Sequence, residues 1–144
     1  MKKCSDVMTR NVVTCTPENS IVEAAQLMKT EDIGPVLIVD NDDSRTLVGI
    51  LTDRDIVIKV IAEGQEAKTT RVGDVMSKKL VTCRTEDDVD VAMQAMAQYQ
   101  LRRIPVVEEN MRLAGIISQA DVATRVDAPE KTGEVVKEIS QENT

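Results

Sequence analysis

The stretch LVGILTDRD at residues 47–55 returns later in the chain as LAGIISQAD at residues 113–121. In each copy a run of β-favouring residues ends in Thr or Ser, and an Asp follows three residues after that hydroxyl. The apolar run predicts a strand, and the hydroxyl stands where the N-cap of a following helix would be. The chain is therefore expected to pass from strand to helix at Thr52 and again at Ser118.

The repetition extends outward from these two stretches. With a shift of 68 residues, DVMT at residues 6–9 falls on DVMS at residues 74–77. With the same shift, VTC at residues 13–15 falls on VTC at residues 81–83. The matches keep their order up to the stretches above, where a loop two residues shorter in the second copy changes the shift. Such self-similarity predicts that one supersecondary unit occurs twice.

Each copy is expected to fold as a β-α-β-β-α unit. After the first strand, Ser20 and Glu23 have the spacing of a capping box, and apolar residues then recur with the period of a helix. Two β-rich runs around a polar turn predict a strand pair, and a second helix follows. The expected strands are residues 12–15, 36–40 and 47–52 in the first copy and 80–83, 104–108 and 113–118 in the second, with closing helices at about 53–63 and from Gln119.

The fold class that follows is α+β (mixed α/β). One copy of roughly 55 residues would bury too little apolar surface to be stable alone, so the copies are expected to share a core. We expect two pseudo-twofold-related β-α-β-β-α repeats packed sheet face to sheet face. The expected parts are residues 5–64 for the first repeat, 65–72 for a polar linker, 73–126 for the second repeat and 127–144 for a tail that forms a marginal helix.

The composition excludes several classes of function. The 144 residues include no His, Trp or Phe and a single Tyr, and the net charge is −7. Without His, neither the Ser-His and Cys-His nucleophile pairs nor His-based metal sites can form. Without an aromatic platform and with an acidic balance, nucleic-acid binding is not expected. No apolar run approaches the roughly 20 residues of a membrane helix, and no signal-peptide stretch opens the sequence, so a cytoplasmic protein without a membrane partner is expected.

Acidic residues offer no specific metal site. Asp53, Asp55 and the acidic loop at residues 40–43 could be imagined to hold Mg²⁺ in an enzyme. The loop, however, lacks the Gly and the closing Glu of an EF-hand, so a solvated turn is the simpler interpretation. With no nucleophile constellation either, we expect no metal site, no catalytic residue and no enzymatic activity.

The three cysteines, Cys4, Cys15 and Cys83, have no CxxC spacing. Cys15 and Cys83 occupy equivalent positions in the two copies and could approach each other near the pseudo-twofold axis. A redox switch is one interpretation of this pair. Packed thiols in a reducing cytosol are the other, and they are the usual state of few, unpatterned cysteines.

The repeat resembles the CBS domain, and the pair resembles a Bateman module, over residues 5 to about 126. The resemblance rests on Asp-Val-Met before each first strand, on Pro35 and Pro105 at the start of the second strands, and on the ending Gly-h-h-Thr/Ser-x-x-Asp, where h is apolar. Residues 51–59 and 102–106 add a similarity to the stand-alone CBS pairs of bacteria, such as the hypoxic response protein group. The resemblance implies a regulatory module.

The resemblance also implies a ligand site. CBS pairs commonly bind AMP, ADP, ATP or S-adenosylmethionine in the clefts between repeats, here as a regulatory ligand and not as an obligatory cofactor. In the family the Thr or Ser of the ending motif contacts phosphate, its Asp holds the ribose hydroxyls, and backbone near the first strand faces the adenine. The matching residues are Thr52, Asp55, Ser118 and Asp121, with Arg54 beside the first pair, and Val13, Thr14, Val81 and Thr82 at the adenine.

The spacing of these residues makes chemical sense without the family. A hydroxyl at a helix start adds a donor to the free N–H groups there, and a carboxylate one turn on can accept from two vicinal hydroxyls. The same residues would also serve as ordinary helix caps. Arg102 and Arg103 stand where related modules carry basic pairs that reach phosphate. The second copy is therefore expected to supply most of the phosphate contact, and a solvated pair is the alternative.

The sequence thus predicts a sensor that binds an adenine nucleotide or S-adenosylmethionine and signals to an unknown protein effector through a change of conformation or assembly. Bateman modules often associate in pairs, so the resemblance implies a homodimer. The alternative is a ligand-free dimerisation scaffold that recruits a protein partner. Substitution of Asp55 or Asp121 distinguishes the two, because only a sensor would lose ligand affinity.

Overall fold

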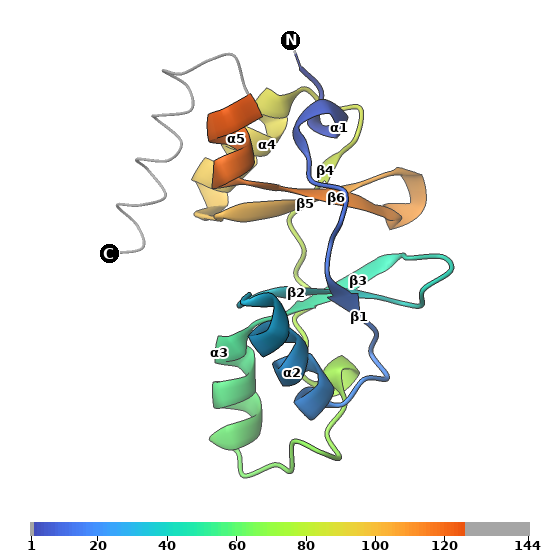
Figure 1. Ribbon diagram of the computed structural model, residues 1–144, viewed down its shortest axis with the longest axis vertical. Coiled ribbons are helices and arrows are strands. Elements are labelled where there is room, and N and C mark those ends of the chain that lie inside the picture. The colour runs from blue at the N-terminus through green and yellow to red at the C-terminus, as the bar shows by residue number, and fades with distance from the viewer. Residues whose placement is uncertain (1, 126–144) are drawn as a thin grey trace. The chain divides into compact units, whose positions relative to one another are not determined.

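The computed structural model describes residues 2–125 of the chain. The expected tail, residues 127–144, lies outside the described residues. The chain forms two compact units: a continuous unit, Val13–Leu80, and a composite unit that combines the residues up to Val12 with those from Val81 onward. Each unit contains a small sheet with helices on one of its faces (Figure 1).

The continuous unit has a three-stranded sheet whose first two strands are parallel and whose last two are antiparallel. Its elements are β1 (Thr14–Cys15), α2 (Ile21–Glu31), β2 (Val36–Val39), β3 (Leu47–Leu51), α3 (Asp53–Ile56), the π-helix η1 (Val57–Ile61) and the 3₁₀ turn η2 (Val72–Asp74). The predicted capping box starts α2: the Ser20 hydroxyl accepts from the Glu23 N–H at 3.1 Å, and the Glu23 carboxylate accepts from the Ser20 N–H at 2.9 Å.

The composite unit repeats this arrangement with the sheet order β4-β5-β6. Its elements are α1 (Cys4–Val7), β4 (Cys83–Arg84), α4 (Val89–Tyr99), β5 (Arg103–Val107), the 3₁₀ turn η3 (Glu109–Met111), β6 (Leu113–Ser118) and α5 (Gln119–Arg125). β4 pairs with β5 in parallel, and β5 pairs with β6 antiparallel. The mixed α+β fold class is therefore confirmed.

Two local features differ from the expectation. The helix expected over residues 53–63 begins as α3 and continues as η1, where the Ala62 N–H donates to the Val57 carbonyl at 2.9 Å, five residues back. The first strands are shorter than expected, because β1 pairs with β2 only at Thr14 and Cys15.

The Asp-Val-Met segments are attached in an order that the linear repeat does not suggest. The 2–9 segment (residues 2–9, including α1) belongs to the composite unit, and the 70–77 segment (residues 70–77, including η2) belongs to the continuous unit. Val72, at the end of the expected linker, is fully buried. The equivalent backbone bonds, all of 2.8–2.9 Å, run from Val89 N to Lys2 O and Cys4 N to Asp87 O for the 2–9 segment, and from Ile21 N to Thr70 O and Val72 N to Asn19 O for the 70–77 segment.

The glycine of each ending motif makes room for these segments. A Cβ at Gly115 would lie 2.7 Å from the Thr9 carbonyl oxygen and 2.8 Å from the Met8 sulfur. A Cβ at Gly49 would lie 2.5 Å from the Met76 sulfur. Both glycines are therefore required by the close approach of an Asp-Val-Met segment to the sheet.

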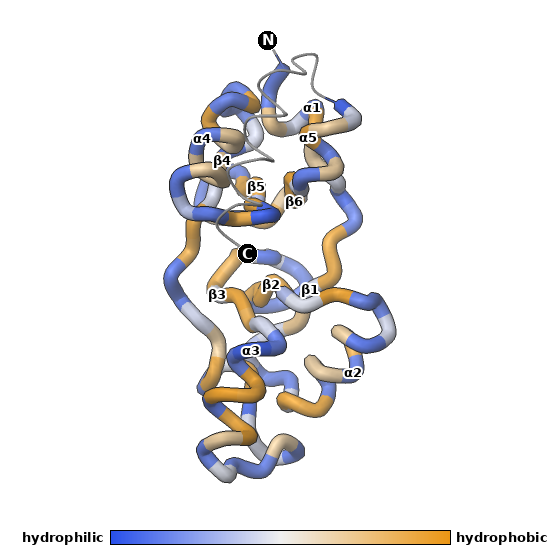
Figure 2. Tube along the Cα trace, turned by 90° about the vertical axis from the view of Figure 1, so that its left-hand side faces the viewer, coloured by the Kyte–Doolittle hydropathy of each residue, from blue (hydrophilic) through white to orange (hydrophobic). Residues whose placement is uncertain are grey.

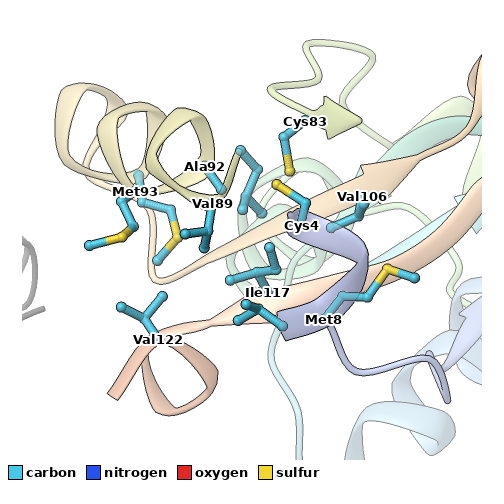
Figure 3. Packing of buried hydrophobic residues seen from close by; sticks show 12 residues of the cluster. Cys4, Met8, Cys83, Val89, Ala92, Met93, Val106, Ile117 and Val122 are labelled. Atoms are coloured by element: carbon cyan, nitrogen blue, oxygen red, sulfur yellow. The ribbon is translucent and has the colours of Figure 1, made fainter. Parts of the chain in front are cut away.

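Each unit has its own hydrophobic core. In the composite unit Val7, Met93 and Ile117 bring α1, α4 and β6 together, as Figure 3 shows for most of this cluster. In the continuous unit Ile21 and Leu51 belong to the corresponding cluster from α2 and β3. No helix in the described part of the chain has the length and apolar character needed to cross a bilayer.

Candidate functional site

The predicted Thr52–Asp55 pair lies at the turn from β3 to α3 in the continuous unit. The Thr52 hydroxyl accepts from the Asp55 N–H at 3.1 Å, and the Asp55 carboxylate accepts from the Thr52 N–H at 3.0 Å. The pair is therefore a capping box in this structure. Arg54 is exposed beside it, and the Asp53 carboxylate accepts from the Arg54 N–H at 3.0 Å.

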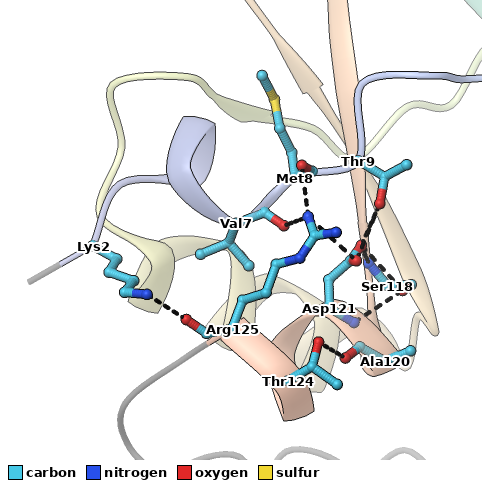
Figure 4. A network of polar contacts seen from close by, with 9 residues as sticks. All are labelled: Lys2, Val7, Met8, Thr9, Ser118, Ala120, Asp121, Thr124 and Arg125. Carbon is cyan, nitrogen blue, oxygen red and sulfur yellow. Dashed lines mark hydrogen bonds and ion pairs between the residues drawn. The ribbon is translucent and has the colours of Figure 1, made fainter.

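The Ser118–Asp121 pair occupies the equivalent turn from β6 to α5 in the composite unit, with more partners (Figure 4). The Asp121 carboxylate accepts from the Ser118 N–H at 3.0 Å and from the Ser118 hydroxyl at 3.1 Å. It also accepts from the Thr9 hydroxyl at 3.1 Å, which ties the 2–9 segment to α5. The Asp121 side chain is 10% exposed and that of Asp55 19%, so the second carboxylate is the more enclosed of the two.

A cation one helical turn after each Asp completes the arrangement. Lys59 lies 3.4 Å from the Asp55 carboxylate and donates to the Val75 carbonyl at 3.1 Å. Arg125 lies 3.8 Å from the Asp121 carboxylate. It donates to the Val7 carbonyl at 2.9 Å and to the Met8 carbonyl at 3.0 Å.

Each cation therefore links the candidate Asp to an Asp-Val-Met segment. Lys59, Arg125 and Thr9 were not predicted from the sequence as members of this network. The i,i+4 spacing of Asp and cation in both copies was a usable signal for the first two. Thr9 gave no such signal, because it lies 112 residues from Asp121 in sequence.

The two arginines of the second copy lie beside the Ser118–Asp121 pair. Arg103 is paired with Ser118 across β5 and β6, and the Arg102 carbonyl accepts from the Gln119 N–H at 3.1 Å. Both arginines are exposed. The structure therefore places two basic residues next in the backbone to the hydroxyl–carboxylate pair, at one end of the composite sheet.

The remaining candidates are divided between the units as the repeat predicts. Val13 and Thr14 belong to the continuous unit with Thr52, and Thr14 is paired with Leu37 in the sheet. Val81 and Thr82 belong to the composite unit, immediately before β4. All four are partly buried. Each unit thus contains one hydroxyl–Asp pair and one pair of residues predicted to lie at the adenine, whereas the two adjacent arginines occur in the composite unit.

The acidic loop at residues 40–43 is a turn organised by its own hydrogen bonds. The Asp40 carboxylate accepts from the Ser44 hydroxyl at 2.6 Å and from the Thr46 N–H at 2.9 Å. The Ser44 hydroxyl bond is the first cause that lowers the pKa of Asp40 below its ordinary value. Within residues 2–125, no group of three or more metal-ligating side chains could hold an ion.

Comparison with known proteins agrees with this description. Residues 4–62 and 72–128 each match the CBS domain. CBS domain-containing protein YhcV of Bacillus subtilis is 38% identical over 143 residues, which cover 99% of this chain and 99% of YhcV.

Two solved structures are also similar. The crystal structure of Hypoxic Response Protein I with two coordinated zinc ions has a TM-score of 0.76 and 35% identity, covering 88% of this chain and 100% of that one. The CBS domain pair of protein MJ0100, in complex with 5-methylthioadenosine and S-adenosyl-L-methionine, has a TM-score of 0.69 and 27% identity, covering 85% and 94%. With both repeats matched and the fold shared, the chain belongs to the CBS domain family and is a regulatory module built of one CBS pair.

Proposed function

We propose that this CBS pair is a cytoplasmic sensor of an adenosine-containing ligand, either AMP, ADP, ATP or S-adenosylmethionine. The observation that carries the proposal is the recurrence of a hydroxyl and a carboxylate at equivalent strand-to-helix turns, Thr52 with Asp55 and Ser118 with Asp121. The complex of the MJ0100 CBS pair with two adenosine derivatives supports the same ligand class.

The two residue sets are suited to different parts of such a ligand. Asp55 is the more exposed carboxylate, and its oxygens can accept from the two vicinal hydroxyls of a ribose. Asp121 already accepts from Ser118 and Thr9, so a ribose there would have to displace the Thr9 hydroxyl. Arg103 and Arg102 give the composite unit exposed cations beside Ser118, which suits phosphate.

The proposal therefore assigns most of the phosphate contact to the composite unit. Backbone near Val13 and Thr14, and near Val81 and Thr82, is assigned to the adenine. Arg54 is assigned a weaker role at phosphate, because the carboxylate of Asp53 lies beside it.

Isothermal titration with each of the four ligands tests the proposal. Micromolar affinity for one of them is expected, and D55N or D121N should weaken it by about tenfold or more, the loss of a charge-assisted hydrogen bond. D53N is the matched control, since it removes an exposed carboxylate next to the motif. No heat with any of the four ligands on folded protein would contradict the proposal.

The arginine assignment has its own readout. R103A should reduce affinity for a phosphate-bearing nucleotide by about tenfold and leave S-adenosylmethionine binding unchanged, because that ligand has no phosphate. Equal nucleotide affinity of R103A, R102A and the wild type would contradict the phosphate assignment.

We also propose that the module is a homodimer. The side chains of Val57, Ile58 and Ile61 are 57%, 44% and 63% exposed on η1, the hydrophobic segment that continues from α3 (Figure 2). Large apolar side chains gathered at the surface are typical of an interaction site. Light scattering at micromolar concentration should give the mass of a dimer, and I61E should shift it toward the monomer. A monomeric wild type would contradict this proposal.

A further inference from the structure

Two of the three cysteines meet in the core of the composite unit. Cys4 begins α1 and Cys83 begins β4, and the side chains are 0% and 2% exposed. Figure 3 shows the two sulfur atoms directed toward one another. The 2–9 segment is held in this position by backbone bonds, including Cys4 N to Asp87 O at 2.8 Å. Both thiols are free in this structure.

The continuous unit supplies a natural control. In the repeat, Val72 is equivalent to Cys4 and Cys15 is equivalent to Cys83. Val72 and Cys15 are likewise buried in one hydrophobic cluster. The same pair of buried positions therefore occurs in both units, and cysteine occupies both positions of the pair in the composite unit alone.

The two Asp-Val-Met segments also differ in how the backbone connects them to their own units. The 70–77 segment follows the continuous unit directly along the backbone, as part of Val13–Leu80. The 2–9 segment reaches the rest of the composite unit along the backbone only through the whole continuous unit. A bond between Cys4 and Cys83 would fasten the segment to its own sheet directly.

We infer that Cys4 and Cys83 are a redox-active pair that forms a reversible disulfide when the protein meets hydrogen peroxide. The Cys4 thiol gives up its proton and the resulting thiolate attacks one peroxide oxygen. The O–O bond breaks, a sulfenic acid forms on Cys4, and the departing hydroxide takes up the released proton and leaves as water. The Cys83 sulfur then attacks the Cys4 sulfur, the S–O bond breaks, and hydroxide leaves with the Cys83 proton as water. Two thiols lose two electrons and peroxide is reduced to two water molecules, and a thiol reductant reverses the bond.

The electrostatics of the pair support Cys4 as the attacking group. Its hydrogen bond with Cys83 is the first cause that lowers the pKa of Cys4. The same bond raises the pKa of Cys83. Burial, followed by the nearby Glu23 charge, raises the pKa of Cys15 to about 11. Since the thiolate is the reactive form, Cys4 is expected to react before Cys15.

Thiol counting on the full chain tests the inference. Reduced protein is treated with peroxide, unfolded, alkylated and measured by intact mass and peptide mapping. One alkylated thiol, Cys15, is expected, together with a mass loss of about 2 Da and a linked Cys4–Cys83 peptide, and dithiothreitol should restore three thiols. The oxidised form should unfold roughly 5–10 °C higher, because a disulfide restricts the unfolded chain.

Two variants serve as controls. C4V places in the composite unit the residue that the continuous unit has at Val72, and it should abolish the mass loss. C15V should form the cross-link as well as the wild type does. The inference would be overturned by any of four results: three free thiols after peroxide, a link through Cys15, a link between two molecules, or stable overoxidation of Cys4 without a link. Each of these can be observed on the wild-type protein, so the test does not depend on whether the variants fold.

Discussion

The two units contain the same parts but join them differently. In the continuous unit the Asp-Val-Met segment follows its own helix along the chain, whereas in the composite unit it comes from the opposite end of the sequence. The equivalent backbone bonds have nearly equal lengths in both units. The contacts of the segment, and not its covalent connection, therefore determine where it packs.

The polar contacts show where the units diverge. In the composite unit the Thr9 hydroxyl donates to Asp121, and Arg125 donates to two carbonyls of the 2–9 segment. In the continuous unit Lys59 donates to one carbonyl, and the Ser77 hydroxyl accepts from the Lys79 N–H at 3.4 Å. The segment without a direct backbone connection is thus held by the larger set of side-chain bonds.

The largest expected effect on stability comes from adding a methyl group at either motif glycine, where an Asp-Val-Met segment lies against the sheet. G115A should destabilise the protein by about 2–3 kcal/mol and G49A by about 1–2 kcal/mol, as overpacked positions do. The difference follows from the obstacle: at Gly115 it is the Thr9 backbone, and at Gly49 it is first the flexible end of Met76. Urea unfolding of both variants measures it, and equal losses would contradict the comparison.

The next effect separates the two carboxylates. D121N should lower the free energy of unfolding by about 2 kcal/mol, because it leaves the partly buried donors of Ser118 and Thr9 with a weaker acceptor. D55N should lower it by about 0.5–1 kcal/mol, since this carboxylate is more exposed and has fewer donors. The test is chemical denaturation without ligand. A larger loss for D55N would show that the networks were ranked wrongly.

A smaller effect concerns pH. The pKa of Cys15 in the folded protein is about 11 against an ordinary value of 9.0, so the unfolded chain loses this proton first as pH rises. The associated stability is present below pH 9 and is lost toward pH 11, by roughly 1–2 kcal/mol between pH 8 and pH 10.5. C15A should lack this component when both proteins are unfolded at pH 8 and pH 10.5.

Local spacing explains what could be predicted from the sequence. The capping box at Ser20 and the β6 strand over 113–118 depend on neighbouring residues, and both occur as expected. The two hydroxyl–Asp pairs could also be predicted, because each depends on a spacing of three residues. In the structure both pairs form the reciprocal hydrogen bonds of a capping box. The π-helical continuation at η1 has no comparable signal, because VIKVI reads as ordinary helix.

What could not be predicted depends on contacts between distant residues. The repeat puts Asp-Val-Met before each first strand, but nothing in the linear pattern says which sheet the segment will join. Cys4 and Cys83 are 79 positions apart in the sequence, and no spacing rule relates them. The role of Gly49 and Gly115 could not be predicted either, because it depends on the close approach of Met76 to Gly49 and of Met8 to Gly115.

The smallest expected effect concerns two equivalent surface ion pairs, one in each unit. Lys3 contacts Glu86 at 2.8 Å in the composite unit, and Arg71 contacts Glu18 at the equivalent place in the continuous unit. The bond with Glu86 is the first cause that raises the pKa of Lys3. K3A and R71A should each change the melting temperature by less than about 2 °C, because the four side chains are more than half exposed and remain solvated.

A contact that occurs in both units shows that the geometry is repeated, and it does not show that the contact is strong. A drop above about 5 °C for K3A alone would mean that the 2–9 segment depends on this ion pair in a way that the 70–77 segment does not.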